Sequence, residues 1–380
     1  MEQLDMDLIE LSDDNIEDSS EEQDIPMSRY SITSYGADYP VDGLVKRINR
    51  GDIYIPKFQR SFVWKIDQAS RFIESLLFGL PVPGIFLAKE TETNRLIVID
   101  GQQRLRTLQF FYNGVFNPQL ETGSGIPFEL KKVAEQFEGK TYENLHEDDR
   151  RMLDDSILPA TIVRQDEPHH ESEQPSSIYH IFERLNTGGS KLFPQEIRSC
   201  IIYGEFNDCL AELNENMVWQ KIFQGSASAT QPDPKQRMKD IELILRFLSL
   251  FLDLEKYKGS MKDFLNTFMK KNRNLKIHKK DYLKSLFDRS ISTVYDAIGI
   301  KAFRPRRGLN AAVFDAVMVG ISRRLEQGEI QDLSTLTNAY DSLVENKEFR
   351  DVSINARQIS SPKNVGERIE LATSAFANLR

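Results

Sequence analysis

The stretch Leu96-Ile97-Val98-Ile99-Asp100-Gly101-Gln102-Gln103-Arg104-Leu105-Arg106-Thr107-Leu108 decides the fold of the first half of the chain. It predicts a buried strand that runs directly into a helix, because apolar residues precede Asp-Gly and return at helical spacing after it. The first backbone N–H groups of a helix have no partner within the helix, and the helix dipole favours an anion there. Gly101 has no side chain, so we expect that a phosphate could approach this turn closely.

The phase of this helix separates its two arginines. Leu105 and Leu108 mark the buried side, Arg104 lies at the edge of that side, and Arg106 points toward solvent. A guanidinium near a buried edge needs a carboxylate or a phosphate as its partner. The sequence leaves two alternatives open: Arg104 pairs with Asp100, or it binds a phosphate.

A second motif comes earlier, at Ile55-Pro56-Lys57-Phe58-Gln59-Arg60-Ser61-Phe62-Val63-Trp64. A short strand over residues 53–55 ends at the proline, and the following turn presents Gln59 and Arg60. Aromatic side chains on both sides of the turn could anchor it in the core and hold Arg60 rigid. A plain surface turn is the alternative.

A third motif combines a helix over residues 178–186 with a second helix that begins at Pro194. Its polar residues are open to two interpretations. They form a structural ion pair in a helical hairpin, or Arg184 and Asn186 complete the pocket suggested by the first two motifs.

The organisation of the chain predicts an α+β protein of 380 residues. Residues 1–28 hold eleven acidic and no basic side chains, so we expect a disordered acidic tail. The expected domains are a small mixed α/β domain over residues 29–170 and an all-helical domain over residues 171–380. Expected helices of the second domain cover residues 177–187, 194–203, 236–256, 260–270, 281–298, 310–326, 331–344 and 362–378.

The three motifs occur in the order expected for one family, and over residues 35–205 the chain resembles the N-terminal domain of GmrSD-type modification-dependent restriction proteins. The shared marks are the Gln-Arg turn that ends at Trp64, the Asp-Gly-Gln-Gln-Arg turn, and a helix pair with Asn186, Glu196 and Arg198. The resemblance implies a fold shared with the nucleotide-binding domain of ParB partition proteins and with sulfiredoxin. It also implies binding of a nucleoside triphosphate, ATP or GTP, with Mg²⁺.

The resemblance assigns a role to each matching residue. Arg60 and Arg104 would neutralise the polyphosphate, the N–H groups of Gln102 and Gln103 would cradle it, and Asp100 would hold Mg²⁺ or position water. Gln103 is a candidate to orient the attacking water. The expected catalytic residues are thus Asp100 and Gln103, the expected metal ligand is Asp100, and the expected nucleotide-binding residues are Gln59, Arg60, Gly101, Gln102, Arg104 and Asn186.

Several classes of protein are excluded or disfavoured by what the sequence lacks. It has no P-loop, no serine-hydrolase elbow and no histidine-centred nuclease motif, so we expect a separate partner nuclease. No apolar run is long enough to cross a membrane, and we expect a cytoplasmic protein. A sulfiredoxin-like enzyme is disfavoured because neither Cys200 nor Cys209 lies near the two candidate phosphate-binding turns, the Gln-Arg turn and the Asp-Gly turn.

Two functions remain in competition. The first is a nucleotide-hydrolysing sensor or regulatory subunit of a bacterial anti-phage or restriction-type defence system. The second is a non-enzymatic DNA-binding or scaffold protein that retains the fold. DNA contact would run through the basic segments Lys270–Lys280 and Lys301–Arg307, although a solvated loop is the alternative for each.

Overall fold

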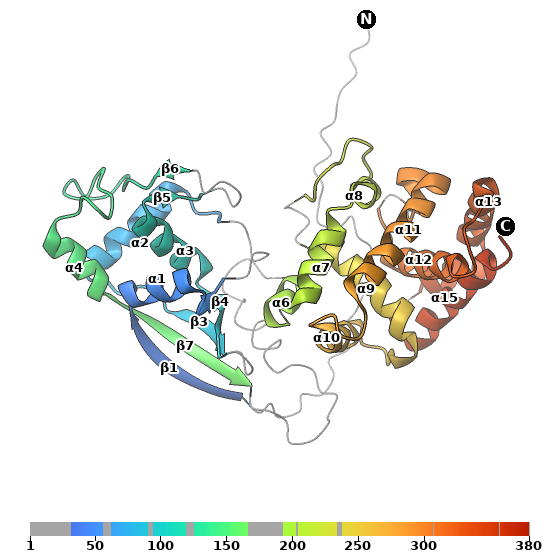
Figure 1. Ribbon diagram of the computed structural model, residues 1–380, viewed down its shortest axis with the longest axis horizontal. Coiled ribbons are helices and arrows are strands. Elements are labelled where there is room, and N and C mark those ends of the chain that lie inside the picture. The colour runs from blue at the N-terminus through green and yellow to red at the C-terminus, as the bar shows by residue number, and fades with distance from the viewer. Residues whose placement is uncertain are drawn as a thin grey trace, which may run out of the picture. The chain divides into compact units, whose positions relative to one another are not determined.

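The computed structural model describes residues 32–55, 62–89, 94–118, 125–165, 193–202, 204–233, 238–306, 308–356 and 358–379. These residues fall into two compact units, one within residues 27–201 and one within residues 202–380 (Figure 1). The first unit combines a small sheet with helices and the second is helical, which confirms the predicted α+β class. The predicted tail, the predicted domain boundary after residue 170 and the predicted helix over residues 177–187 lie outside the described residues and stay predictions.

A mixed five-stranded sheet forms the first unit, in the strand order β1-β7-β3-β4-β2. β3 and β4 pair antiparallel, as predicted, whereas β2 runs parallel to β4 and β7 runs parallel to β3. At Tyr54 the chain therefore heads toward the end of the sheet at which Asp100 lies. The strands are β1 Ile32–Pro40, β2 Ile53–Tyr54, β3 Ile85–Lys89, β4 Leu96–Asp100 and β7 Ile157–Gln165.

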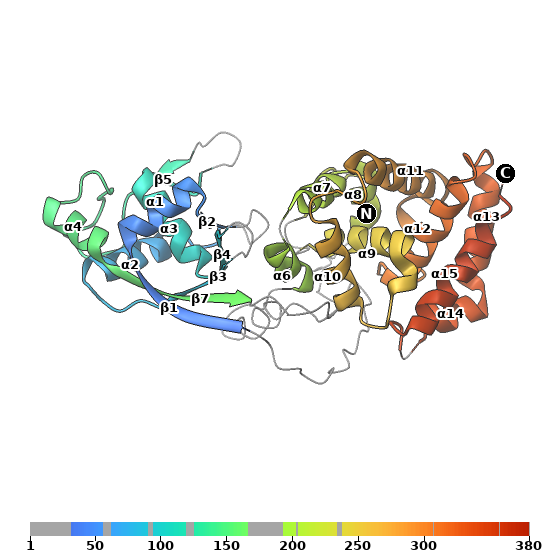
Figure 2. The same cartoon turned by 60° about the horizontal axis from the view of Figure 1, so that its bottom comes forward.

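Helices cover this sheet, and Figure 2 shows α1, α2 and α3 on the same side of it. Their apolar stripes share one core cluster with the strands, in which Leu105 and Leu108 of α3 join Val98 of β4. Ile97 and Ile99 are buried as well but lie outside that cluster, so both faces of β4 are covered. The helices of this unit are α1 Val41–Arg50, α2 Ile66–Leu77, α3 Gln102–Asn113 and α4 Glu147–Asp155, and α3 begins directly after Gly101 as predicted.

One strand of the sheet escapes prediction. β1 pairs with β7 over its whole length, but its side chains from Thr33 to Gly36 are exposed and show no apolar alternation. Its extended conformation comes from the backbone hydrogen bonds to β7, which no local pattern reveals. A separate two-stranded hairpin consists of β5 Val115–Phe116 and β6 Ile126–Pro127.

The helical unit is built around α12 Ala311–Leu325, which is enclosed on nearly all sides and packs against α9, α11 and α15. The long apolar helix α9 keeps a partly exposed side, and α12 is the more deeply buried of the two. The short helices α7, α8 and α14 are not predicted. The remaining helices are α7 Glu205–Asn214, α8 Met217–Gln224, α9 Lys239–Asp253, α10 Met261–Asn272, α11 Lys280–Ile298, α13 Leu333–Glu345, α14 Lys347–Ser353 and α15 Pro362–Phe376.

None of the helices in the described part of the chain is both long enough and apolar enough to cross a membrane.

Three charged side chains meet inside the helical unit. Asp315 of α12 accepts hydrogen bonds from Arg246 of α9 at 2.7 and 3.2 Å and from Arg368 of α15 at 3.2 Å. Asp315 is fully buried, and the two arginines are 4% and 1% exposed. Two buried cations therefore share one carboxylate. Removal of Asp315 would leave both arginines buried without this counter-charge.

We expect Asp315→Ala to lower the free energy of unfolding of the helical unit by about 3–5 kcal/mol, the cost typical of breaking a buried ion pair from one side. Asp341→Ala removes an exposed carboxylate from α13 and is the matched control, with an expected change within about 0.5 kcal/mol. Urea unfolding followed by far-ultraviolet circular dichroism measures both. Equal losses in the two variants would contradict a structural role for the buried cluster.

Candidate functional site

The turn between β4 and α3 has the predicted form, with the strand ending at Asp100 and the helix beginning at Gln102. Gly101 between them has a φ of 97°, a conformation that L-residues with side chains rarely adopt. A Cβ on Gly101 would lie 2.3 Å from Cγ2 of Ile85 on the neighbouring strand β3. The missing side chain therefore makes room for Ile85, and the expected close approach of a phosphate to this turn stays a prediction.

The helix that starts here has no side-chain cap and no acidic residue in its first turn. Gly101 cannot supply a capping oxygen, and Arg104 brings a positive charge to the end of the helix that already carries the positive dipole. The electrostatics at the start of α3 therefore favour an anion.

Arg104 forms the ion pair that the sequence leaves open as one of its two alternatives. Its Nη2 lies 2.7 Å from Oδ2 of Asp100, and its Nη1 donates to the carbonyl oxygen of Pro83 at 3.1 Å. The Arg104 side chain is only 13% exposed, whereas that of Asp100 is 50% exposed. The guanidinium is held against the protein while half of its carboxylate partner faces solvent.

Gln103 joins the first motif to the second. Its Oε1 accepts hydrogen bonds from the backbone N–H groups of Val63 and Trp64, at 3.0 and 3.2 Å. The ring of Phe62 packs edge-on against Phe110 of α3, with ring centroids 5.0 Å apart. Residues 62–64 are therefore anchored on α3, and this contact, between residues about forty positions apart, has no signal in the local sequence.

The segment that follows the Gln-Arg turn thus lies beside the β4–α3 turn, and the strand that precedes the Gln-Arg turn runs toward the same end of the sheet. β2, which precedes the turn, runs parallel to β4 with Tyr54 opposite Ile97. Residues 63 and 64, which follow the turn, donate hydrogen bonds to Gln103 of α3. Gln59 and Arg60 themselves lie outside the described residues, so their predicted roles are not tested by the geometry.

The described part of the third motif is structural. In α6, Pro194–Ile201, the backbone N–H of Phe193 donates to Oε2 of Glu196 at 2.7 Å, and Arg198 donates to the side chain of Gln195. Glu196 and Arg198 are 3% and 1% exposed, and α6 contacts β4. Asn186 and Arg184 lie outside the described residues, so their predicted place in the pocket stays a prediction.

The exposure of Arg106 differs from the prediction. The helical phase predicts a solvent-facing side chain, but Arg106 is partly buried, and its Nε is shielded from water without a hydrogen bond. Burial lowers the pKa of this guanidinium below its usual value, and the nearby Tyr54 of β2 opposes that shift. The helical phase alone assigns this side of α3 to solvent, but burial in the folded chain reaches Arg106, with Tyr54 of the neighbouring strand nearby.

The first unit offers single candidate metal ligands and not a cluster of them, as far as the described residues show. Among the described residues, no three His, Cys, Asp or Glu side chains come together as a metal site. Mg²⁺ often binds through one or two protein carboxylates with the remaining ligands from phosphates and water, and the half-exposed Asp100 fits that pattern. Cys209, in the helical unit, is buried, and burial raises the pKa of its thiol to about 11, which fits a core residue.

The two basic segments are less open than the sequence suggests. Arg304 is not available to DNA, because its guanidinium donates to the carbonyl oxygens of Ile222 and Phe223 at the end of α8, at 2.6 Å each. Lys280 pairs with Glu212, which also binds Lys284 at 2.8 Å. Exposed lysines of the first segment remain at positions Lys270, Lys271, Lys276 and Lys279.

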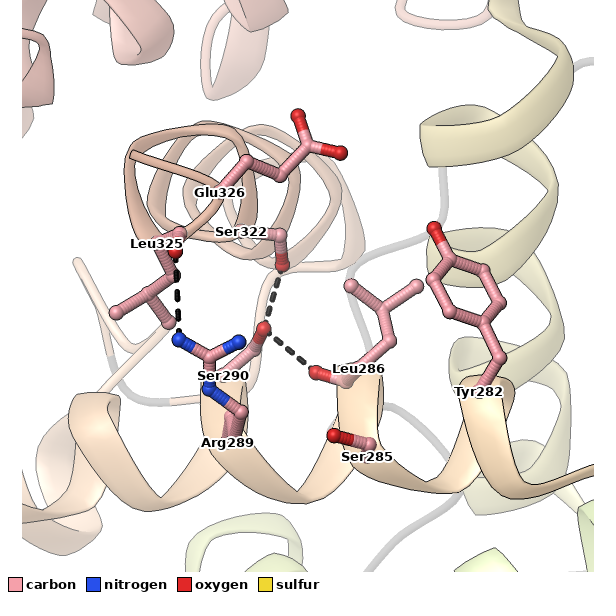
Figure 3. Close-up of a pocket in the computed structure, with 8 residues that line it drawn as sticks. All are labelled: Tyr282, Ser285, Leu286, Arg289, Ser290, Ser322, Leu325 and Glu326. Carbon is pink, nitrogen blue, oxygen red and sulfur yellow. Dashed lines mark hydrogen bonds between the residues drawn. The ribbon is translucent and has the colours of Figure 1, made fainter. Parts of the chain in front are cut away.

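Two hollows in the helical unit do not suit a nucleotide. A cavity of about 160 Å³ between α11 and α12 is smaller than most ligand sites, and its Ser290 and Ser322 hydroxyls bond to each other at 2.6 Å (Figure 3). A more open hollow of about 390 Å³ beside the first basic segment is lined by Glu205 and Asp208 as well as by two lysines. Its carboxylates would repel phosphate.

Comparison with known proteins gives the family context of the β4–α3 turn. Residues 41–203 match the family model described as GmrSD restriction endonuclease, N-terminal domain, which agrees with the resemblance seen over residues 35–205. An uncharacterized protein of Methanocaldococcus jannaschii is 21% identical over 268 residues, an alignment that covers 50% of this chain and 46% of the relative. The chain thus spans about half the length of this curated relative. The expected kinship with ParB and sulfiredoxin stays a prediction.

We expect Gly101→Ala to destabilise the first unit more than Gly139→Ala does. Both glycines have positive φ, 97° and 74°, but an added Cβ at Gly139 meets nothing within 4 Å. Gly139→Ala should cost about 1–2 kcal/mol for the backbone alone, and Gly101→Ala a further 1–3 kcal/mol or so for the collision with Ile85.

Urea unfolding of the two variants measures this difference. In an Ile85→Ala background the excess cost of Gly101→Ala should shrink, because most of the colliding side chain is gone. Equal costs for both glycine variants would show that contact with Ile85 does not set the β4–α3 turn.

Proposed function

Because residues 41–203 form a GmrSD-type N-terminal domain, we propose that this protein binds a nucleoside triphosphate with Mg²⁺ at the β4–α3 turn and hydrolyses it. The protein would act as a sensor or regulatory component of a restriction-type anti-phage defence system, together with a separate effector such as a nuclease. The observation that carries the proposal is the anchoring of residues 62–64 by Gln103, which holds one end of the Gln-Arg turn at the start of α3.

The proposed binding roles follow from the charges at that point. Arg104 neutralises phosphate, and the N–H groups at the start of α3 cradle it, with Gln59, Arg60 and Asn186 as further contacts from the other motifs. Gly101 supports the site indirectly, because its contact with Ile85 fixes the direction in which α3 leaves the sheet.

The Asp100–Arg104 pair links metal binding with phosphate binding. Asp100 can turn its exposed carboxylate toward a cation, and Arg104 then gives up its only carboxylate partner among the described residues. The guanidinium becomes available to a phosphate in the same step. Asp100 is thus the proposed metal ligand and the residue that releases Arg104.

Gln103 has a positioning role in this proposal before any catalytic one. Its Oε1 is engaged by two backbone N–H groups, so a water-orienting role would have to use its Nε2. The same residue would then hold the second motif in place and contact the attacking water.

A non-enzymatic DNA-binding protein or scaffold is the second candidate. The exposed lysines at positions 270, 271, 276 and 279 favour it, since they lie close together along the chain and remain open to solvent. Phosphate release by the purified protein, with and without DNA, separates the two candidates.

We expect Arg104→Ala to abolish binding of ATP and GTP in isothermal titration calorimetry, because the variant removes the phosphate-facing cation. Arg151→Ala is the matched control, since Arg151 on α4 also pairs with an acidic residue four positions before it, Glu147, but lies on an exposed helix. The control should bind like the parent. Parental affinity in Arg104→Ala would show that the site is misassigned.

If the exposed lysines bind DNA, the affinity should fall steeply with salt. Replacement of Lys270 and Lys271 by glutamine should reduce the slope of log affinity against log salt by about one unit for each phosphate that is no longer neutralised. Replacement of the exposed Lys347 and Lys363 by glutamine is the control. An affinity for DNA that does not change between low and moderate salt would exclude this segment as the DNA-binding surface.

A further inference from the structure

Arg106 carries a charge for which the described part of the protein supplies no counterpart. It is partly buried, no water reaches its Nε, and no hydrogen bond or ion pair of its guanidinium is found among the described residues. A buried donor without an acceptor destabilises a fold, and the effect is larger for a cation. Such a group calls for a specific explanation.

Other arginines with restricted access to water have acceptors for their Nη groups, although the Nε atoms of Arg150 and Arg368 are shielded and unpaired like that of Arg106. Arg104 is bound by Asp100 and the Pro83 carbonyl, and Arg304 by the carbonyl groups at the end of α8. In the same way, Arg246 and Arg368 share Asp315. Each of these four charges stabilises a contact between elements, whereas Arg106 stabilises none that the described residues show.

Arg106 lies close to the start of α3. Gln103, Arg106 and Phe110 follow one another at helical spacing, and the first and third of them hold the segment at residues 62–64. Helical side chains lean toward the N-terminus of their helix, so that a long side chain at position 106 can reach back to the first turn.

We infer that Arg106 is a second phosphate-binding cation, which contacts the polyphosphate of a bound nucleoside triphosphate. The inference rests on the proposed function, because it takes the start of α3 as the phosphate site. Arg104 and Arg106 are two residues apart and therefore lie about 200° apart around the helix. The two guanidiniums reach the phosphates from opposite sides of the helix end.

The chemistry of Arg106 specifies the ligand class. A guanidinium edge that includes Nε presents two parallel N–H donors, which match two oxygens of one phosphate or of two successive phosphates. Burial weakens competition by water and makes that contact stronger. A triphosphate should therefore depend on Arg106 more than a monophosphate does.

Arg106→Gln tests the inference, because glutamine keeps a polar side chain and the helix propensity but removes the charge. Arg71→Gln, which removes an exposed arginine from α2, is the matched control. Calorimetry with Mg²⁺ measures the affinity of each variant and of the parent for ATP, GTP, AMP and inorganic triphosphate. Thermal unfolding of each variant reports on stability.

We expect Arg106→Gln to weaken triphosphate binding by about tenfold or more, the loss typical of a charge-assisted hydrogen bond. The ratio of ATP affinity to AMP affinity should fall, and the melting temperature should stay constant or rise. Arg106→Lys, which retains the charge but not the fork, should recover part of the affinity. The Arg71→Gln control should bind every probe like the parent.

Three outcomes would overturn the inference. If Arg106→Gln binds triphosphates like the parent while Arg104→Ala does not, the proposed function stands and only the role of Arg106 falls. If Arg106→Gln lowers the melting temperature and weakens ATP and AMP equally, Arg106 is a structural residue. A parent protein that binds none of the four probes removes the proposed function, and this inference with it.

Discussion

The close packing of Gly101 against Ile85 is the constraint on which the candidate site depends. It brings the end of β4 against β3 with no side chain between them and requires a left-handed backbone conformation at the turn. α3 can then leave the sheet in only a narrow range of directions. That direction carries Gln103 to residues 62–64 and Arg104 to the Pro83 carbonyl. A different residue at position 101 would shift all three contacts together.

The charges around the start of α3 differ in how far the protein itself satisfies them. Arg104 is satisfied by Asp100 and a carbonyl oxygen, so it can be released only when Asp100 takes another partner. Arg106 has no such partner among the described residues and is available at once. Under the proposed function, one cation tied to the proposed metal ligand Asp100 and one permanently available cation would make phosphate binding strong and also dependent on the metal. The helical unit shows the contrasting case, in which Asp315 accepts hydrogen bonds from Arg246 and Arg368, and Arg368 also donates to the carbonyl oxygen of Ile359.

Apolar periodicity predicts the elements that bury a regular face. The helices α1, α2 and α3 and the β3–β4 pair follow this rule because their own side chains drive their burial, whereas α4 is a polar helix with Leu153 as its buried residue. β1 escapes prediction because its conformation comes from backbone pairing with β7, and α7, α8 and α14 are too short for a strong periodic signal. The Asp-Gly turn is predictable because few residues other than glycine tolerate its backbone conformation, although the neighbour that demands glycine, Ile85, is not.

The amino-acid sequence alone therefore specified the strand–turn–helix unit, the α+β class and the resemblance to the GmrSD N-terminal domain, whose family model matches residues 41–203. All three follow from patterns within short stretches of chain. Contacts between distant stretches were decided by the folded chain. Gln103 serves as an acceptor because residues 63 and 64 arrive beside it, and Arg106 is partly buried, with Tyr54 of β2 nearby. Arg304 likewise becomes a cap for α8 and not a DNA contact. Hydrogen bonding and desolvation depend on which residues lie nearby in space. Helical phase describes one element at a time, so it does not predict these contacts.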